Sequence, residues 1–234
     1  MAIALMAMLL GSAPVWASMH ESTARVPVTV WIYDGFGVSD DDLTAARAAA
    51  DTILREAGIA PVWFNCALVE GKWWGSSDRC KSGVGPDEII VRLLRSSRLD
   101  TESNRVPLGE ARVDLQTHTG SIATVFADRV ASTSERAGAN ARGVLGRVIA
   151  HEVGHLLMGT NHHSMNGLMR AVWTDLELRR AIGLEWHFSA SEARCMRAGI
   201  VQRSDRAGEH GMVRWSECEA TRRHSSSATS WQAR

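Results

Sequence analysis

The pattern of hydrophobic and polar positions predicts a strand, a helix and a second strand in the first part of the chain. Residues 26–33 (VPVTVWIY) are rich in β-branched and aromatic residues, as strands are. Ser39 and the three aspartates after it supply an N-cap and an acidic first turn for a helix. We expect this helix to end near Glu56, because Gly58 follows it. Residues 60–64 (APVWF) predict the second strand.

Two further strands and a long helix are predicted in the middle of the chain. Residues 66–86 are rich in Gly, Ser and Trp and predict a loop, and residues 88–94 (EIIVRLL) predict a third strand. A polar, turn-forming stretch at 116–120 precedes a fourth strand at 121–130 (SIATVFADRV). Residues 142–158 are almost entirely apolar and have a helical pattern, so we expect a buried helix there.

Composition indicates one globular domain. The chain has 234 residues, of which 45% are hydrophobic and 22% are charged. Because 26 basic residues balance 26 acidic ones, there is no strongly basic surface, and we expect no nucleic-acid partner. We expect the domain to span residues 24–202 and to end with a short helix at 189–199. Residues 203–234 are polar and Ser-rich and predict a poorly ordered tail.

The N-terminus predicts export. Residues 1–19 carry no charge, and MAIALMAMLL has the length of the apolar region of a secretory signal. Val15, Trp16 and Ala17 offer a small-residue cleavage site, so we expect a signal peptide over residues 1–17 and a secreted or periplasmic protein. The segment lacks an N-terminal Lys or Arg, so an uncleaved weak anchor is the alternative. Gly11, Ser12 and Pro14 argue against a stable membrane-spanning helix.

Four cysteines, an even number in an exported chain, predict disulfides. Three connectivities are possible, and the two local pairs favour Cys66 with Cys80 and Cys195 with Cys218. The first pair would close a loop of about 15 residues, worth about 3 kcal/mol through the lost entropy of the unfolded chain. A zinc ribbon is excluded, because none of the cysteines has the CxxC spacing that brings two thiolates to one metal.

The long helix carries the HExxH pattern in residues 151–155 (HEVGH). His151 and His155 lie four residues apart, hence about 40° apart around a helix and about 6 Å along it. Both imidazoles can therefore reach one metal ion. Glu152 flanks the pair, as suits a base that acts on metal-bound water. The alternative is that both histidines are core residues that bind no metal. Their rings would then need other buried hydrogen-bond partners, because each buried polar group without a partner destabilises the fold by about 1–3 kcal/mol.

The residues after the helix offer a third ligand. Gly159 can end the helix in a left-handed turn, and the chain then returns with His162 and His163 toward the first two histidines. Three imidazoles and a water form the open tetrahedral arrangement of catalytic zinc, so we predict Zn²⁺.

The run HEVGHLLMGTNHHS, followed by Gly167-Leu168-Met169, resembles the metzincin metallopeptidases, in which HExxHxxGxxH precedes a methionine turn. More narrowly, HLLxGxxxHSxxGLMRAxW resembles small exported bacterial zincin-like proteins of unsettled function. The resemblance covers roughly residues 26–173. It implies an α+β, zincin-like fold: a small mixed sheet of about four strands, one backing helix and a buried active-site helix. It also implies that Met169 forms an apolar floor beneath the metal.

The chain departs from the metzincin spacing. Gly159 lies four residues after His155 instead of three, and His162 and His163 lie seven and eight residues after it instead of six. Counting GxxH from Gly159 gives His162, whereas the narrower resemblance gives His163, which we favour. Some metzincins stabilise the oxyanion with a tyrosine near the methionine turn, but the single tyrosine of this chain is Tyr33.

Other conspicuous residues have simpler interpretations. His118 is expected to be a surface histidine. Trp73 and Trp74 are expected to form a satellite core beside the disulfide, and Asp175 to be a solvated, helix-capping residue. The remaining histidines, His187, His210 and His224, have no partner spacing.

These features predict an exported zinc-dependent metallopeptidase. The metal ligands would be His151, His155 and His163, and Glu152 would be the general base for the zinc-activated water that attacks a peptide or protein substrate. The alternative is a catalytically silent zinc-binding protein with a zincin fold that acts by interaction. Glu152 is needed for catalysis alone, so its presence favours the enzyme.

Overall fold

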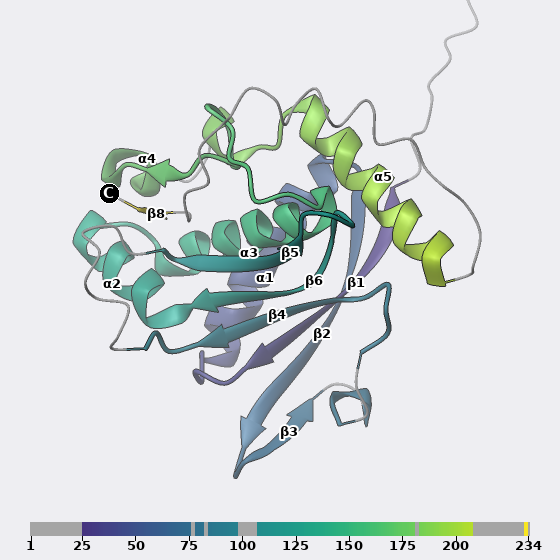
Figure 1. The fold of residues 1–234 in the computed structure, drawn as a ribbon. Coiled ribbons are helices and arrows are strands. Elements are labelled where there is room, and N and C mark those ends of the chain that lie inside the picture. The colour runs from purple at the N-terminus through teal and green to yellow at the C-terminus, as the bar shows by residue number, and fades with distance from the viewer. Residues whose placement is uncertain are drawn as a thin grey trace, which may run out of the picture.

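The computed structural model describes residues 25–75, 78–81, 84–97, 107–180, 183–207 and 232–233 (Figure 1). The elements in chain order are β1 (Val26–Asp34), α1 (Asp40–Glu56), β2 (Ile59–Val69), β3 (Lys72–Gly75), η1 (Asp78–Cys80), β4 (Ile89–Leu94), β5 (Gly109–Asp114), β6 (Thr119–Phe126), α2 (Ala127–Ala137), α3 (Ala141–Met158), β7 (Val172–Trp173), α4 (Asp175–Arg179), η3 (Leu184–Trp186), α5 (Ala190–Ala207) and β8 (Gln232–Ala233).

A twisted six-stranded mixed sheet forms the centre of the molecule, in the order β3-β2-β1-β4-β6-β5. The inner strands β2, β1, β4 and β6 are parallel, and the outer strands β3 and β5 pair antiparallel with their neighbours. The mixed sheet with helices is compatible with the predicted α+β class. The expected number of about four strands was wrong. Within this sheet, the two strands that were not predicted are both edge strands, β3 and β5, which are short or carry charged residues on an exposed face.

Two helices, α1 and α3, pack against each other on one face of the sheet, and Figure 1 shows both behind it. The helix predicted to end near Glu56 is α1, and Ser39 Oγ accepts a hydrogen bond from the Asp42 N–H as its N-cap. The buried helix predicted at 142–158 is α3, of which nearly all side chains from Val144 onward are buried. Both predictions are confirmed.

Two predicted boundaries were wrong. The predicted loop at 66–86 holds the end of β2 and all of β3, which pair through Val69 and Lys72 around a tight turn. The predicted strand at 121–130 ends at Phe126, and α2 begins at Ala127. Ala127, Val130 and Ala137 are buried at helical spacing, so the apolar stripe of α2 continues past the point at which the strand was expected to end.

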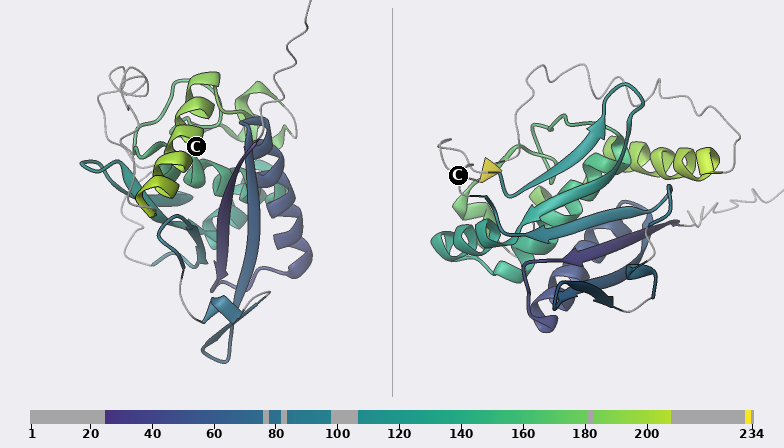
Figure 2. Two further views of the ribbon diagram at one scale, coloured as in Figure 1. Left: turned by 90° about the vertical axis from the view of Figure 1, so that its right-hand side faces the viewer. Right: turned by 60° about the horizontal axis from the view of Figure 1, so that its bottom comes forward.

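The last long helix, α5, is longer than the predicted helix at 189–199 and continues to Ala207, past the expected domain boundary at residue 202. Arg203, assigned from the sequence to the tail, is buried. Its guanidinium donates hydrogen bonds to the carbonyls of Gly120 and Leu156. These bonds attach α5 to β6 and to the C-terminal turn of α3. Figure 2 shows α5 from two further directions.

The predicted disulfide between Cys66 and Cys80 is present, with an S–S distance of 2.02 Å. It belongs to a second, smaller core with Trp31, Phe64 and Trp73, which confirms the satellite core expected for Trp73. The other favoured pair includes Cys218, which lies outside the described residues, as does the predicted signal peptide.

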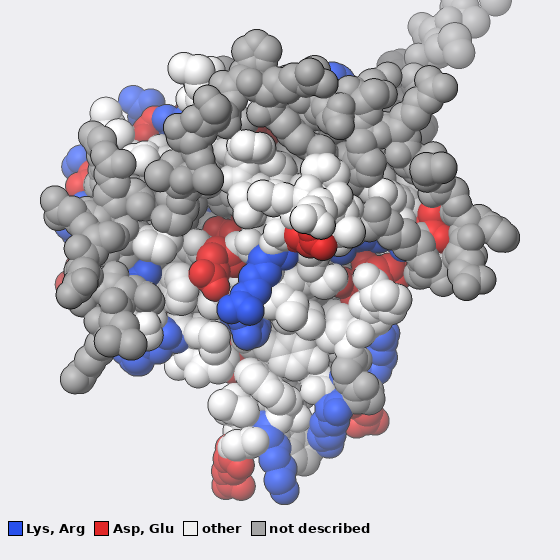
Figure 3. Space-filling view, viewed as in Figure 1, with Lys and Arg blue, Asp and Glu red and all other residues white. Residues whose placement is uncertain are grey.

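No helix in the described part of the chain is long and apolar enough to cross a membrane. On the face seen in Figure 3, acidic and basic side chains lie interspersed among uncharged ones. This distribution agrees with the equal numbers of acidic and basic residues in the sequence.

Candidate metal centre

Helix α3 supplies two histidines and a glutamate to one buried region. His151, Glu152 and His155 are 0%, 1% and 4% exposed. His151 and His155 lie one helical turn apart, and their Nε2 atoms are 3.0 Å from each other. The spacing read from the sequence therefore does bring the two imidazoles together on the helix.

Hydrogen bonds to carbonyl groups fix the tautomer of both rings. Nδ1 of His151 lies 2.9 Å from the carbonyl oxygen of Leu168, and Nδ1 of His155 lies 2.8 Å from that of Thr160. A carbonyl oxygen can accept but not donate, so each Nδ1 carries the hydrogen. In the neutral rings, each Nε2 then presents a lone pair toward the other. A cation between them removes that repulsion, and such carbonyl contacts are typical of metal-binding histidines.

The third histidine comes from the loop after α3. Gly159 ends the helix in the predicted left-handed conformation, with φ 60° and ψ 40°. The chain then turns back, so that His163 Nε2 lies 3.3 Å from His155 Nε2. Among the described residues, His151, His155 and His163 form a group whose ligand atoms all lie within 4.8 Å of one another, close enough to bind a metal ion.

His162, the alternative from the sequence, is not in this group. Its backbone N–H donates to the hydroxyl of Thr160, within the turn that leads to the third histidine. Of the two adjacent histidines, the structure thus brings His163 to the other two rings.

Burial keeps the three imidazoles neutral. Desolvation, followed by the neighbouring histidines, holds the pKa of His151 well below its usual value. Desolvation and His163 lower the pKa of His155 to about 3, and desolvation and His162 lower the pKa of His163 to about 4. Neutral imidazole is the protonation state that binds a metal, so these rings are in the binding form at neutral pH.

Glu152 follows His151 directly on α3, and its carboxyl group is wholly buried. Burial, and then the charge of Glu110, raise the pKa of Glu152 well above its usual value. Its Oε1 atom has no hydrogen-bond partner among the described residues. A buried carboxyl oxygen without a partner is costly unless a ligand or water occupies the position beside it.

Met169 and Trp173 pack beneath and beside the helix. Met169 is fully buried, and a Cβ built on Gly154 would lie 2.9 Å from its sulfur, so the thioether lies directly against the helix between the two histidines. The ring of Trp173 meets that of His151 edge-on, with centroids 5.8 Å apart. Apolar groups therefore surround the imidazoles on this side.

A buried carboxylate holds the loop that carries His163. Glu192 of α5 is 2% exposed and accepts hydrogen bonds from the hydroxyl of Ser164 and, at 2.7 Å, from the Ser189 N–H. The Ser164 N–H donates to the Met169 carbonyl at 2.8 Å. Ser164 thus connects the third histidine, the residue beneath the helix and α5, a connection that the sequence did not reveal.

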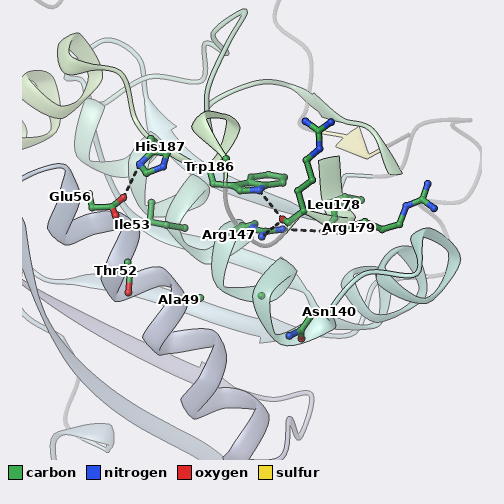
Figure 4. A pocket seen from close by; sticks show the side chains of 13 residues that line it. Ala49, Thr52, Ile53, Glu56, Asn140, Arg147, Leu178, Arg179, Trp186 and His187 are labelled. Atoms are coloured by element: carbon green, nitrogen blue, oxygen red, sulfur yellow. Dashed lines mark hydrogen bonds and ion pairs between the residues drawn. The ribbon is translucent and has the colours of Figure 1, made fainter. Parts of the chain in front are cut away.

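A cavity of about 290 Å³ lies between α1, the N-terminal half of α3 and the segment after α4 (Figure 4). At its wall, the Arg147 guanidinium lies 3.9 Å from the ring centroid of Trp186 and donates to the carbonyls of Leu178 and Arg180. The cavity includes none of the three histidines, nor Glu152. Arg147 therefore anchors α4 and the residue that follows it to α3.

Among the described residues, the other residues noted in the sequence are not part of the group formed by the three histidines. His118 was expected at the surface, but it is half-buried, and its ring lies 3.1 Å from the Gly159 carbonyl. Asp175 begins α4 behind the N-cap Thr174 and forms an ion pair with Arg136 at 3.2 Å. His187 pairs with Glu56 at 2.8 Å, and His210 and His224 lie outside the described residues.

No protein-family model matches this chain, and no curated protein matches it significantly.

Proposed function

We propose that this protein is an exported zinc-dependent peptidase. The observation that carries the proposal is the convergence of three neutral imidazoles, two of them on the helix that also carries Glu152, a buried carboxyl group whose Oε1 has no partner among the described residues. A core built for stability alone would avoid such a group, because unsatisfied buried polar atoms destabilise the fold.

The donor set fits zinc. Three histidine nitrogens with room for a fourth ligand are the arrangement of catalytic Zn²⁺, whereas magnesium and calcium prefer oxygen ligands. His151, His155 and His163 would hold the ion, and the Leu168 and Thr160 carbonyls would keep two of the rings oriented. The chemistry that zinc supplies when bound is that of a Lewis acid, which lowers the pKa of water and polarises a carbonyl group.

Glu152 would move the protons. Its carboxylate would accept a proton from the attacking water and return it to the leaving amine, the two transfers that peptide hydrolysis requires. Burial raises the pKa of Glu152, which favours its protonated form, the form that returns the proton.

An extended peptide is the substrate that suits the neighbouring sheet edge. Strand β5 is the last strand of the sheet, so one side of it pairs with no other strand of that sheet. Gly109, at its first position, lies against Glu152. A peptide that adds to such an edge gains main-chain hydrogen bonds whatever its sequence, and here it would pass close to the carboxylate.

Secretion or delivery to the periplasm is part of the proposal. The Cys66–Cys80 disulfide supports it, because disulfides form and persist in oxidising compartments.

Hydrolysis of a mixed peptide library by the zinc-loaded chain, with Glu152→Gln as the matched variant, tests the proposal. We expect cleavage by the wild type, and its loss in the variant although zinc stays bound. Bound zinc without cleavage by the wild type would favour the alternative, a zinc-binding protein that acts by interaction.

A further inference from the structure

Strand β5 and helix α3 meet at one point where there is no room for a side chain. A Cβ built on Gly109 would lie 2.6 Å from Glu152 Oε1 and 2.9 Å from both Cδ and Cγ of Glu152. Real Cβ atoms essentially never come within 3.0 Å of another heavy atom, so any residue larger than glycine would force a shift.

Residue 109 has to be a glycine because there is no space for a side chain, and not because its backbone conformation requires glycine. Its φ lies outside the left-handed region, in contrast to Gly159 at +60°. An alanine could therefore adopt the same backbone, and the carboxyl group of Glu152 is the obstacle.

The strand cannot easily move away from the helix. Gly109 pairs with Val125 of β6, and the Phe126 N–H donates to the Leu108 carbonyl at 2.9 Å just before it. Leu108 itself is 1% exposed and belongs to the main core. On the other side, α3 is buried along nearly its whole length. The flexible end of the Glu152 side chain is thus the part that would yield.

We propose that Gly109 is a positioning residue for Glu152: its bare backbone forms the wall against which the carboxyl group rests, and this wall fixes where the group lies relative to the three histidines. The catalytic meaning of this contact depends on the proposed peptidase function. The contact itself does not, so it can be tested separately.

A double-mutant cycle on thermal unfolding tests the contact without any assay of activity. Gly109→Ala is made in the wild-type chain and in Glu152→Ala, where the obstacle is gone. We expect it to lower Tm in the wild type and to leave Tm unchanged or raised in Glu152→Ala, since alanine restricts the unfolded chain more than glycine does.

The control is Gly143→Ala on α3, because a Cβ there meets no heavy atom within 4 Å. It should shift Tm equally in both backgrounds. Equal shifts for Gly109→Ala as well would overturn the proposal. So would failure of Gly109→Ala to fold in both backgrounds, because the backbone would then be the constraint. If Gly109→Ala fails to fold in the wild-type background but folds in Glu152→Ala, the result supports the proposed contact.

Kinetics then test the positioning role. We expect Gly109→Ala to retain zinc and to lower kcat about 100-fold with little change in KM, the size of effect that a displacement of about 1 Å can cause. Gly143→Ala should keep wild-type kinetics. An undiminished kcat in Gly109→Ala would refute the role. If the wild type hydrolyses nothing while the Tm cycle shows coupling, the peptidase proposal fails and the contact stands.

Discussion

Removal of the metal should destabilise the fold by an amount that the structure allows to be worked out. Without a cation, the Nε2 lone pairs of His151 and His155 face each other at 3.0 Å in a region from which water is largely excluded. A buried polar group without a partner costs about 1–3 kcal/mol, so two rings give about 2–6 kcal/mol. Thermodynamic linkage between zinc binding and folding gives a stabilisation of similar size. It is about 4 kcal/mol when the free zinc concentration exceeds the Kd about 1,000-fold.

The assay is thermal unfolding of the purified chain before and after chelation, with zinc added back at the end. For a domain of this size, about 1 kcal/mol shifts Tm by about 2–4 °C, so Tm should fall by about 4–24 °C and recover on re-addition. His162→Ala should behave as the wild type, whereas His163→Ala should respond less to added zinc. An unchanged Tm in protein that mass spectrometry shows to be free of metal would refute the reasoning.

Three further predictions follow from single side chains. Glu152→Gln should keep zinc and lose hydrolysis, which parallel metal analysis and peptide assays would check; cleavage by this variant would contradict the role of the carboxylate. Glu192→Ala should lower the free energy of unfolding by about 1–3 kcal/mol and weaken zinc binding, because Ser164 loses the partner that holds the loop of the third histidine; denaturant titration and zinc competition measure both. For Glu177, burial alone would raise the pKa, but hydrogen bonds from Arg170 and Thr174 lower it to about 2. Its stabilising contribution is therefore complete above the unfolded pKa of about 4.5 and is lost as pH falls toward 2. Glu177→Gln should remove that part of the acid dependence, and identical acid-unfolding curves for the two proteins would show that it contributes nothing.

Helix α3 was predictable because its signals are local. The apolar run that ends at Met158, the histidines four residues apart and Gly159 just past the end each depend on neighbours within two helical turns. The choice between His162 and His163 was harder, because a one-residue difference in loop length decides which ring points inward. The resemblance favoured His163, and the structure places this residue beside the other two.

The surroundings of the site were not predictable in the same way. Strand β5 (GEARVD) alternates charged with small or apolar residues over only six positions, and such a short alternation is a weak strand signal on its own. Gly109 contacts Glu152, and Ser164 contacts Glu192. Both contacts are between residues far apart in the chain, and such contacts cannot be predicted from a local sequence pattern. Helix α2 was not predicted because it begins directly after β6, with no turn residues between them, and its first apolar residues extend the apolar run of the strand.

Metal content measured by mass spectrometry on the purified chain, with His163→Ala and His162→Ala alongside, tests the central claim most directly. The account predicts one zinc per chain in the wild type and in His162→Ala, and loss of that zinc in His163→Ala. A wild-type chain without zinc, or zinc retained in full by His163→Ala, would contradict it.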